Sequence, residues 1–307
     1  HRLDPYFKSD WNPFLFLGHN MVSHLEVYRS SLVRHLGGFR VGYEGSQDYD
    51  LAARVVEQLS ESQVVHIPRI LYHWRILQGS TAASLGEKPY AQTASERAVN
   101  EHLQRLGLAG RVELNTALGG MHRVRWELPD PPPLVSLIIP TRNGKDLVRQ
   151  CIESILAKTT YPNYEILLVD NGSDDPEALG YFRELVESET VRLLRDDGPF
   201  NFSRLNNGAV EIAGGEVLVF LNNDTEVMAP DWLSEMVALT LVPQVGAVGA
   251  KLLYPDGTIQ HGGVVMGVGG CASHMHWRLP AQAPGYFGRA HLLQAYTAVT
   301  AACLAVR

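Results

Sequence analysis

Cysteine is scarce in this sequence, and the cysteines that are present lie far apart. Cys151, Cys271 and Cys303 are the three cysteines of the chain, and no two of them have the close spacing of paired metal ligands. This pattern argues against a zinc-binding module and against the disulfide framework of a small secreted domain. It suits buried free thiols in a reducing compartment, and we assign the cysteines no chemical role.

Long apolar stretches and basic clusters are also missing. The longest apolar runs, such as residues 135–139 and 217–221, are strand-sized and far shorter than the ~20 residues that cross a bilayer. No signal peptide is visible, and the 26 Lys and Arg, against 33 Asp and Glu, include no basic run that would follow a phosphate backbone. We therefore expect no transmembrane segment and no nucleic-acid partner. The chain begins with His1 and ends at Arg307 directly after an apolar run, so we expect it to be a piece of a longer protein.

The second half of the sequence alternates apolar strands with amphipathic helices. We predict strands at 134–139, 164–169, 191–194 and 216–221, and helices at 145–158, 176–187 and 202–213. Such alternation predicts an α/β fold with a mostly parallel sheet flanked by helices. Ligands of these folds bind beyond the carboxyl ends of the strands, where polar residues collect in this sequence.

The first half is less regular. We predict strands at 14–28, 64–67 and 70–74, helices at 48–58 and 91–106, and a hairpin at 111–126. Four prolines between 129 and 133 form a stiff link. We therefore divide the chain into a first part, 1–127, and a second part, 128–307.

Two acidic residues follow strands in the second half. Asp170 precedes the turn Asn171-Gly172-Ser173, and Asp224 follows Asn222-Asn223. Each aspartate alone is equally well explained as a turn or capping residue. Two acidic strand ends in one parallel sheet, with Asn206 and Asn207 between them in sequence, favour a nucleoside diphosphate held together with a divalent metal.

Residues 135–225 resemble the donor half of glycosyltransferase family 2, which has the GT-A fold. The resemblance rests on Ile139-Pro140-Thr141-Arg142-Asn143 after the first strand, on Val169 to Ser173, and on Asn222-Asn223-Asp224 in place of the family's Asp-x-Asp motif. It implies a nucleotide-sugar site built from Pro140, Thr141, Asn143, Asp170, Asn171, Ser173, Asn206, Asn207, Asn223 and Asp224. Because Asn222 brings only an amide oxygen, Asp224 alone inherits the binding of Mn²⁺ or Mg²⁺.

The first half resembles the acceptor side of the same fold. Gly37-Gly38-Phe39 precedes Glu44 to Leu51, a segment in which the family carries its catalytic base. The resemblance assigns that role to Asp48, with helix capping as the alternative. His73, within Tyr72-His73-Trp74, is either a second metal ligand or a hydrogen-bonded core histidine.

The base-bearing segment precedes the donor-binding segment, which reverses the family's order. Either the chain is circularly permuted, or it joins the end of one tandem transferase domain to the start of the next. Residues 22–29 can be laid against residues 300–307, which favours tandem domains. We expect the two parts to complement each other as one GT-A unit, within a single chain or in a swapped homodimer.

The resemblance implies metal-dependent, inverting transfer of a sugar from a nucleotide sugar to a hydroxyl of a saccharide or glycolipid acceptor. It is reminiscent of bacterial surface-polysaccharide enzymes, which work at the cytoplasmic face of the inner membrane. The alternatives are a sugar-nucleotide pyrophosphorylase-like enzyme and a truncated, inactive carbohydrate-binding module. The glycine-poor segment 141–145 argues against the pyrophosphorylase.

Overall fold

The computed structural model describes residues 4–75, 89–115 and 118–307, and it divides the chain into two compact units. Unit 1 comprises His1–Glu127 and Gln282–Ala295, and unit 2 comprises Leu128–Ala281 and Tyr296–Arg307. The chain first passes from unit 1 to unit 2 at the proline-rich link. The return of residues 282–295 to unit 1 was not indicated by any pattern in the sequence. Among the described residues, no helix combines the length and the apolar character needed to cross a membrane.

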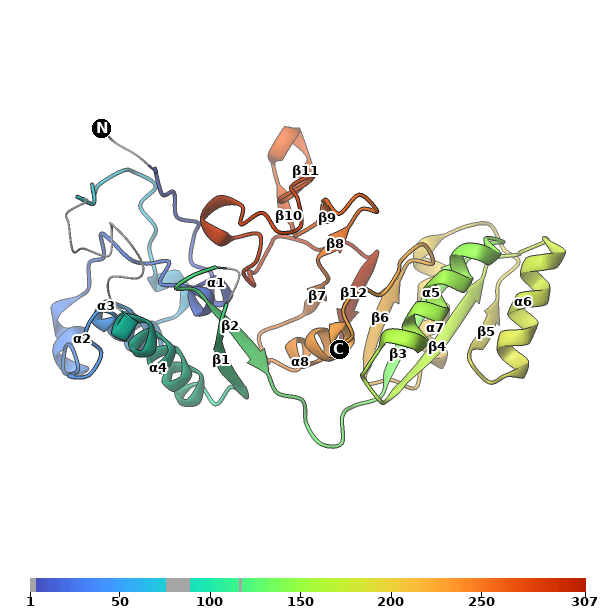
Figure 1. The fold of residues 1–307 in the computed structure, drawn as a ribbon, viewed down its shortest axis with the longest axis horizontal. Helices are drawn as coiled ribbons and strands as arrows, with labels where there is room; N and C mark the ends of the chain where they lie inside the picture. The colour runs from blue at the N-terminus through green and yellow to red at the C-terminus, as the bar shows by residue number, and fades with distance from the viewer. Residues whose placement is uncertain (1–3, 76–88, 116–117) are drawn as a thin grey trace. The chain divides into compact units, whose positions relative to one another are not determined.

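Unit 2 is built on a six-stranded sheet in the order β5-β4-β3-β6-β12-β7 (Figure 1). The strands are β3 (Val135–Thr141), β4 (Tyr164–Asp170), β5 (Arg192–Arg195), β6 (Val217–Leu221), β7 (Ala247–Gly249) and β12 (Cys303–Val306). The first four named pair in parallel, whereas β12 runs antiparallel to both β6 and β7. The predicted α/β fold with a mostly parallel sheet is therefore confirmed.

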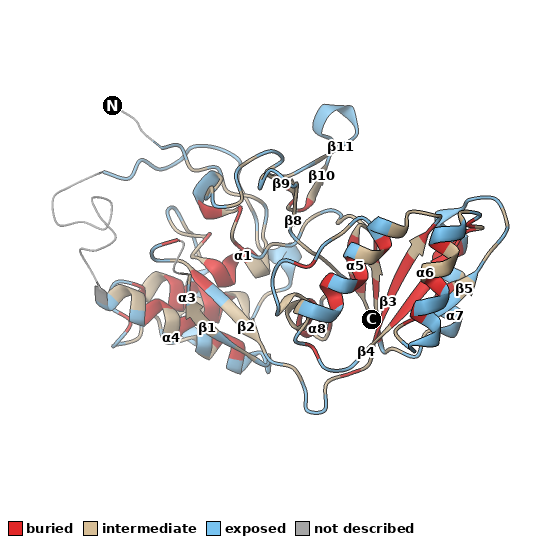
Figure 2. Ribbon diagram, turned by 45° about the vertical axis from the view of Figure 1, so that its right-hand side comes forward, coloured by how far each residue is buried: buried red, intermediate tan, exposed pale blue. Residues whose placement is uncertain are grey.

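Helices cover both faces of this sheet (Figure 2). On one face, α5 (Lys145–Lys158), α6 (Pro176–Glu187) and α8 (Trp232–Thr240) pack against Leu137 and Ile139. On the other face, α7 (Phe202–Ile212) packs against Ile138 and Leu167. Successive residues of a strand point to opposite faces, so a strand covered on both sides is apolar throughout. This explains why β3 was recognisable as a continuous apolar run.

The helices of unit 2 begin where the sequence places capping residues. Asp175 accepts hydrogen bonds from the first turn of α6 and is followed by Pro176, and Asn201 caps α7 in the same way. Helix α5 follows Gly144, whose φ of 64° is a left-handed conformation that glycine adopts without steric cost. The predicted helices at 145–158, 176–187 and 202–213 are confirmed to within one residue.

Between β7 and β12 the chain forms a small β-rich extension. Its strands are β8 (Leu252–Leu253), β9 (Ile259–His261), β10 (Val264–Met266) and β11 (Ala272–His274), with the short 3-10 helix η3 (Val268–Gly270) between β10 and β11. Strand β8 pairs with β9 and β10 pairs with β11, both antiparallel.

Unit 1 is mainly helical. It contains α1 (Pro13–Gly18), α2 (Ser30–His35), α3 (Gln47–Val56), the 3-10 helix η1 (Glu61–Gln63), α4 (Pro89–Arg105), the antiparallel pair β1 (Gly110–Leu114) and β2 (His122–Trp126), and the 3-10 helix η4 (Tyr286–Gly288). Its core joins Phe16, Tyr49, Val99 and Leu103, and Leu292 of the returning segment packs into it. The predicted hairpin and the two predicted helices are confirmed.

Three strands that we predicted in unit 1 are wrong. Residues 14–28 contain helix α1, because Asn12 caps its first turn and Pro13 occupies a position that suits a helix start. Residues 64–67 and 70–74 form no strand, and Val65 is 78% exposed. Apolar residues alone do not make a strand when no neighbouring strand completes the backbone hydrogen bonds.

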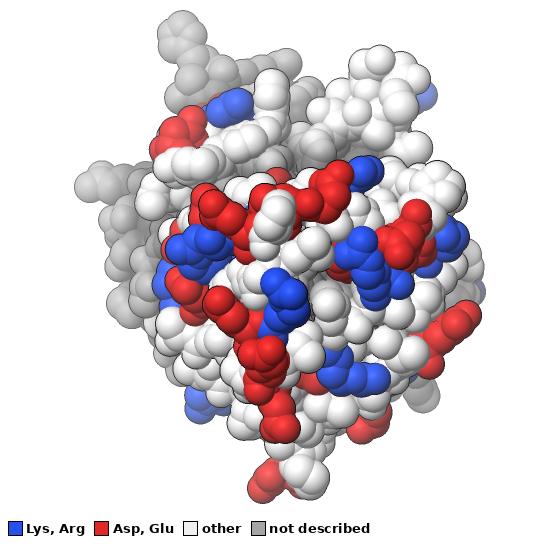
Figure 3. Space-filling model, turned by 90° about the vertical axis from the view of Figure 1, so that its right-hand side faces the viewer, with Lys and Arg blue, Asp and Glu red and all other residues white. Residues whose placement is uncertain are grey.

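Charges of both signs are interspersed on the surface. On the face in Figure 3, Lys and Arg side chains lie among Asp and Glu side chains. Unit 2 contains ion pairs between such residues, for example between Lys145 and Glu177 and between Arg192 and Glu165. Among the described residues of this face, no large area carries charges of a single sign. The face therefore lacks the electrostatic field that would attract a charged polymer.

Candidate active site

The carboxyl ends of β3, β4 and β6 meet at one edge of the sheet in unit 2. The backbone N–H of Asn171 donates to the carbonyl oxygen of Thr141 over 2.8 Å. The side-chain amide of Asn223 donates to the hydroxyl of Thr141 over 2.9 Å. The three segments that carry the predicted nucleotide-sugar site are therefore joined by direct hydrogen bonds around Thr141.

Asn143 connects the first two of these segments. Its backbone N–H donates to the hydroxyl of Ser173 over 2.7 Å, and its side-chain amide donates to Asp174 over 3.0 Å. Its side-chain oxygen accepts from the backbone N–H groups of Asp174 and Asp175. The hydrogen bond from Asn143 lowers the pKa of exposed Asp174. Asn143 thus links the loop after β3 to the loop after β4. Pro140, directly before Thr141, is only partly buried.

Asp170 is fully buried at the end of β4, and its carboxylate is held by protein groups. One oxygen accepts from the backbone N–H of Ser173 over 2.9 Å, and the other accepts from the guanidinium of Arg195 over 2.7 Å. Buried carboxylates need such partners. The turn-stabilising role that we left open is therefore present in the structure, and contact with a nucleoside stays a prediction.

Asn171 and Asn206 are also buried, each 4% exposed. Asn171 donates to the carbonyl oxygens of Asp196 and Gly198, and Asn206 donates to that of Phe202. Within the described part of the chain, the side-chain oxygen of each is buried without a hydrogen-bond donor. Asn207 instead lies exposed on α7. The structure therefore presents Asn207 to solvent and encloses the other two amides.

Asp224 lies exposed just after β6. The preceding residue, Asn223, is tied to Thr141, and the carbonyl oxygen of Asn222 accepts from the hydroxyl of Thr225 over 2.8 Å. No group of three or more His, Cys, Asp or Glu is placed to hold a metal among the residues described here. A magnesium-like cation bound by one or two carboxylates plus substrate phosphates needs no such group, so Asp224 fits that kind of site.

Residues 136–277, which include all these strand ends, match the model of the family described as Glycosyl transferase family 2. These residues are a family 2 glycosyltransferase domain. The resemblance seen in the sequence at residues 135–225 is thereby confirmed.

Two relatives match the whole chain. An uncharacterized protein, y4gI, of Sinorhizobium fredii is 49% identical, and this chain spans 34% of its length. The O-antigen biosynthesis protein RfbC of Myxococcus xanthus is 40% identical, and this chain spans 24% of its length. The chain thus covers about a quarter to a third of the length of these relatives.

Among solved structures, the mannosyltransferase PcManGT of Pyrobaculum calidifontis, in complex with GDP-Man and Mn²⁺, is similar to part of this chain. It is 27% identical over 43% of this chain and 40% of its own, with a TM-score of 0.37.

In unit 1, Asp48 lies half-buried in the first turn of α3 and accepts a hydrogen bond from the side-chain amide of Asn20 over 3.1 Å. Ser46 occupies the N-cap position of this helix, so Asp48 is not its cap. The role of Asp48 as the catalytic base stays a prediction. His73 is exposed and belongs to unit 1, whereas Asp224 belongs to unit 2, so a metal site shared by the two also stays a prediction.

The sequence did not indicate that Glu26 is close to Asp48. Glu26 accepts a hydrogen bond from the hydroxyl of Tyr28. Burial raises the pKa of Glu26, the hydrogen bond from Tyr28 offsets part of that rise, and the negative charge of Asp48 adds to it. Nearby in sequence, the ring of His24 stacks on those of Tyr72 and Trp74, with centroids 5.0 and 5.1 Å apart. Unit 1 therefore offers a second carboxyl group and an exposed aromatic surface.

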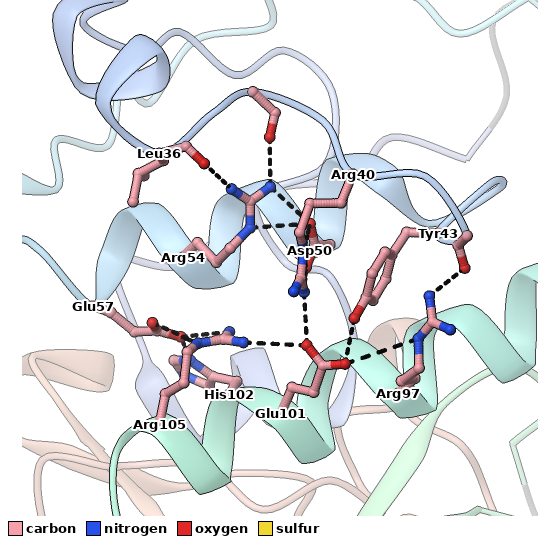
Figure 4. A network of polar contacts seen from close by, with 12 residues as sticks. Leu36, Arg40, Tyr43, Asp50, Arg54, Glu57, Arg97, Glu101, His102 and Arg105 are labelled. Atoms are coloured by element: carbon pink, nitrogen blue, oxygen red, sulfur yellow. Dashed lines mark hydrogen bonds and ion pairs between the residues drawn. The ribbon is translucent and has the colours of Figure 1, made fainter.

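A network of charged side chains holds α3 against α4 (Figure 4). Buried Asp50 binds the guanidinium groups of Arg40 and Arg54, and Arg40 also reaches Glu101 of α4. Just beyond the last residue of α3, Glu57 pairs with His102 and Arg105 of α4. Burial alone would raise the pKa of Asp50, but the hydrogen bonds from Arg40 and Arg54 outweigh it and lower that pKa. The network fixes the helix whose first turn carries Asp48. The spacing of Asp50 and Arg54, four residues apart, is the sequence signal that could have revealed part of it.

Proposed function

We propose that the protein transfers a sugar from a nucleotide sugar to a hydroxyl group of a saccharide or glycolipid acceptor. One observation carries this proposal: the loops after β3, β4 and β6 are hydrogen-bonded into a single edge around Thr141, within a family 2 glycosyltransferase domain. The name of the Myxococcus relative, an O-antigen biosynthesis protein, supports a polymer of the cell surface as the product.

In this proposal the nucleotide occupies the edge formed by these three loops. Exposed Asp224 and the amide of Asn223 face the diphosphate, and the braced loop at Asn143 contacts the nucleoside. Asp224 would hold a divalent cation, Mn²⁺ or Mg²⁺, which supplies Lewis-acid stabilisation of the departing diphosphate. A single carboxylate in the place of two predicts a weaker hold on the cation than an Asp-x-Asp motif gives.

On the acceptor side, Asp48 is the catalytic base. Its carboxylate takes the proton of the acceptor hydroxyl while that oxygen forms a bond to the anomeric carbon and the bond from this carbon to the diphosphate breaks. One displacement inverts the anomeric centre.

The proposal is tested with a panel of nucleotide sugars carrying uridine, guanosine, cytidine and deoxythymidine, incubated with the purified chain and Mn²⁺. We expect release of the nucleoside diphosphate, by slow hydrolysis or by transfer to an added saccharide, and a product of inverted anomeric configuration. Synthesis of a nucleotide sugar from a sugar phosphate would identify a pyrophosphorylase instead. Saccharide binding without any nucleotide binding would identify a carbohydrate-binding module.

A further inference from the structure

Two histidines of the β-rich extension are in direct contact. His261 ends β9 and His274 ends β11, and their Nδ1 atoms are 2.8 Å apart. The rings are nearly perpendicular, at 84°. His261 is 1% exposed, whereas His274 is exposed. The pair therefore combines a buried member with a member that faces solvent.

A third group, the backbone N–H of Thr300, determines which ring nitrogen of His261 carries the proton. The backbone N–H of Thr300 points at Nε2 of His261 over 3.4 Å, and a backbone N–H can only donate. Nε2 of His261 is therefore the acceptor. Burial, with a smaller effect from His274, lowers the pKa of His261 to about 4, so the ring is neutral at pH 7 and its one proton lies on Nδ1.

This arrangement sets the tautomer of the exposed partner. Because Nδ1 of His261 donates, Nδ1 of His274 must accept. A neutral His274 then carries its proton on Nε2. In the part of the chain that the structure describes, no protein group takes up this Nε2–H. His274 thus presents an oriented hydrogen-bond donor to solvent.

A metal ion between the two rings fits less well. It would require both Nδ1 atoms to be unprotonated, which would place a proton on Nε2 of His261, directly against the N–H of Thr300. Two nitrogen ligands of one tetrahedral zinc, each at ~2.0–2.1 Å, would also lie about 3.4 Å apart. The observed 2.8 Å is a hydrogen-bond distance.

The pair lies at the same edge of the sheet as Asp224. In the antiparallel pairing of β12 with β6, Cys303 is opposite Leu221, so residues 300–302 lie beyond the carboxyl end of β6. The carbonyl oxygen of Ala302 accepts from the backbone N–H of Asn222 over 3.0 Å. Thr300, which contacts His261, is two residues from Ala302, and Asp224 is two residues from Asn222. Figure 1 shows the extension strands β8 to β11 and strand β12 of unit 2.

We propose that His261 and His274 form a phosphate-recognition dyad, in which buried His261 is a positioning residue and His274 donates its Nε2–H to a phosphoryl oxygen of a nucleoside diphosphate. The identity of the ligand rests on the proposed function. A phosphoryl oxygen suits this donor because it is a negatively charged acceptor, and a hydrogen bond from an N–H group to an anion is stronger than one between neutral groups. Asp224 provides one carboxylate where two are usual, so the cation is held more weakly, and a second group that binds the diphosphate gains importance.

The dyad itself is tested on the ligand-free chain, independently of function. Long-range ¹H–¹⁵N NMR spectra of the histidine side chains distinguish the two neutral tautomers. We expect His261 to carry its proton on Nδ1 and His274 on Nε2 at pH 7.5. The opposite tautomer of His261, or a tight zinc complex in which both Nδ1 resonances shift, would overturn the dyad and indicate a metal site.

The ligand is tested by calorimetric titration with UDP, GDP, ADP and CDP in the presence of Mn²⁺. We expect His274→Ala to weaken binding of the preferred diphosphate about tenfold, the usual effect of losing one charge-assisted hydrogen bond. His274→Gln, whose amide nitrogen reaches the position of Nε2, should retain most of the affinity. His261→Leu should weaken binding several-fold and His261→Asn, which keeps a donor at the position of Nδ1, should restore it. The control His35→Ala, an exposed histidine of α2, should have no effect.

The two possible failures have different signatures. If the wild-type chain binds no diphosphate, the proposed function fails and the phosphate assignment fails with it, whereas the NMR result still decides whether the dyad exists. If the wild-type chain binds a diphosphate and His274→Ala binds it equally well, the phosphate assignment alone is wrong.

Discussion

The side chain of Asn223 donates a hydrogen bond to the hydroxyl of Thr141, so that the loop after β6 is fastened to the end of β3. Asn223 stands in the middle of Asn222-Asn223-Asp224, the segment that the sequence predicts to take the place of the family's Asp-x-Asp motif, and Asp224 follows it directly. The hydrogen bond therefore fixes the backbone from which the exposed carboxylate projects. The position of Asp224 depends on a residue 83 positions earlier in the chain, 224 minus 141.

We predict that Thr141→Val loosens this edge. The variant leaves the amide of Asn223 without its acceptor, which should lower the free energy of unfolding by about 1 kcal/mol. It should also weaken diphosphate binding about tenfold, because Asp224 is held less firmly. Thr159→Val is the matched control, since it removes the acceptor of the Trp232 indole N–H just beyond the last residue of α5. It should cost similar stability and leave diphosphate binding unchanged.

Removal of the Asp224 carboxylate should abolish metal-dependent binding. We expect Asp224→Ala to bind nucleoside diphosphate weakly and equally with and without Mn²⁺, as measured by calorimetry. The comparison variant Glu187→Ala removes an exposed carboxylate from the last residue of α6 and should behave as the wild type. Unchanged dependence on Mn²⁺ in Asp224→Ala would place the metal site elsewhere.

The sheet of unit 2 could be predicted from sequence because its signals are local. Strand β3 is a continuous apolar run, and α5 repeats its buried residues at helical spacing. The strand predicted at 14–28 is wrong because a short apolar stretch, such as the one that forms α1, has the same appearance in a helix and in a strand. Asn12 and Pro13 decide between the two, because both are typical of a helix start.

The partners within the site could not be predicted in the same way. Arg195 reaches Asp170 across 25 residues, and His261 meets His274 across 13. The first pairing arises from the register of β4 with β5, and the second joins strands of two separate sheets, β8-β9 and β10-β11. Neither arrangement leaves a periodic trace in the segments involved. The extension strands β8 to β11 contain only two or three residues each, too few for alternation to be detected.

Asp48→Asn should reduce turnover far more than donor affinity. A general base acts on the acceptor in the transition state, so we expect kcat to fall about 100-fold or more while the diphosphate Kd stays within a factor of two. The substituted amide keeps an oxygen that can accept from Asn20, which limits structural loss. Equal losses of binding and turnover would show that Asp48 acts on the donor or on the fold.

Asp50→Ala should strongly destabilise unit 1. Its carboxylate is fully buried between Arg40 and Arg54, and the variant leaves nearly buried Arg54 without a counter-charge. Breaking such a pair from one side costs about 3–5 kcal/mol. Asp10→Ala, which removes a carboxylate that is 95% exposed beside His66, is the control and should change stability little. Thermal or urea unfolding of both variants measures the difference.

Buried histidines should make the protein less stable below neutral pH. Burial lowers the pKa of His122 and of His19 to about 4, and the pKa of His261 is lowered to a similar value. In the unfolded chain each takes up a proton near pH 6.5, but in the folded chain only near pH 4. Between these values the unfolded state binds more protons, so stability falls as the pH falls through this window.

Below this pH window, stability depends on a second group, the carboxylate of Asp50. The pKa of Asp50 is lowered from 3.8, so its contribution is fully present above about pH 4 and is lost as the pH falls through its folded-state value. Urea unfolding at pH 7, 5.5 and 4.5 therefore leaves the contribution of Asp50 nearly unchanged. The histidine variants separate the share of the histidines from that of glutamates with a lowered pKa, such as Glu57. We expect the free energy of unfolding to decrease continuously over this range, and His122→Leu and His261→Asn should each reduce that decrease by more than about 1 kcal/mol. The exposed-histidine variant His35→Ala should keep the full decrease. Midpoints that stay constant from pH 7 to 4.5 in the wild type would show that these histidines are not held neutral by the fold.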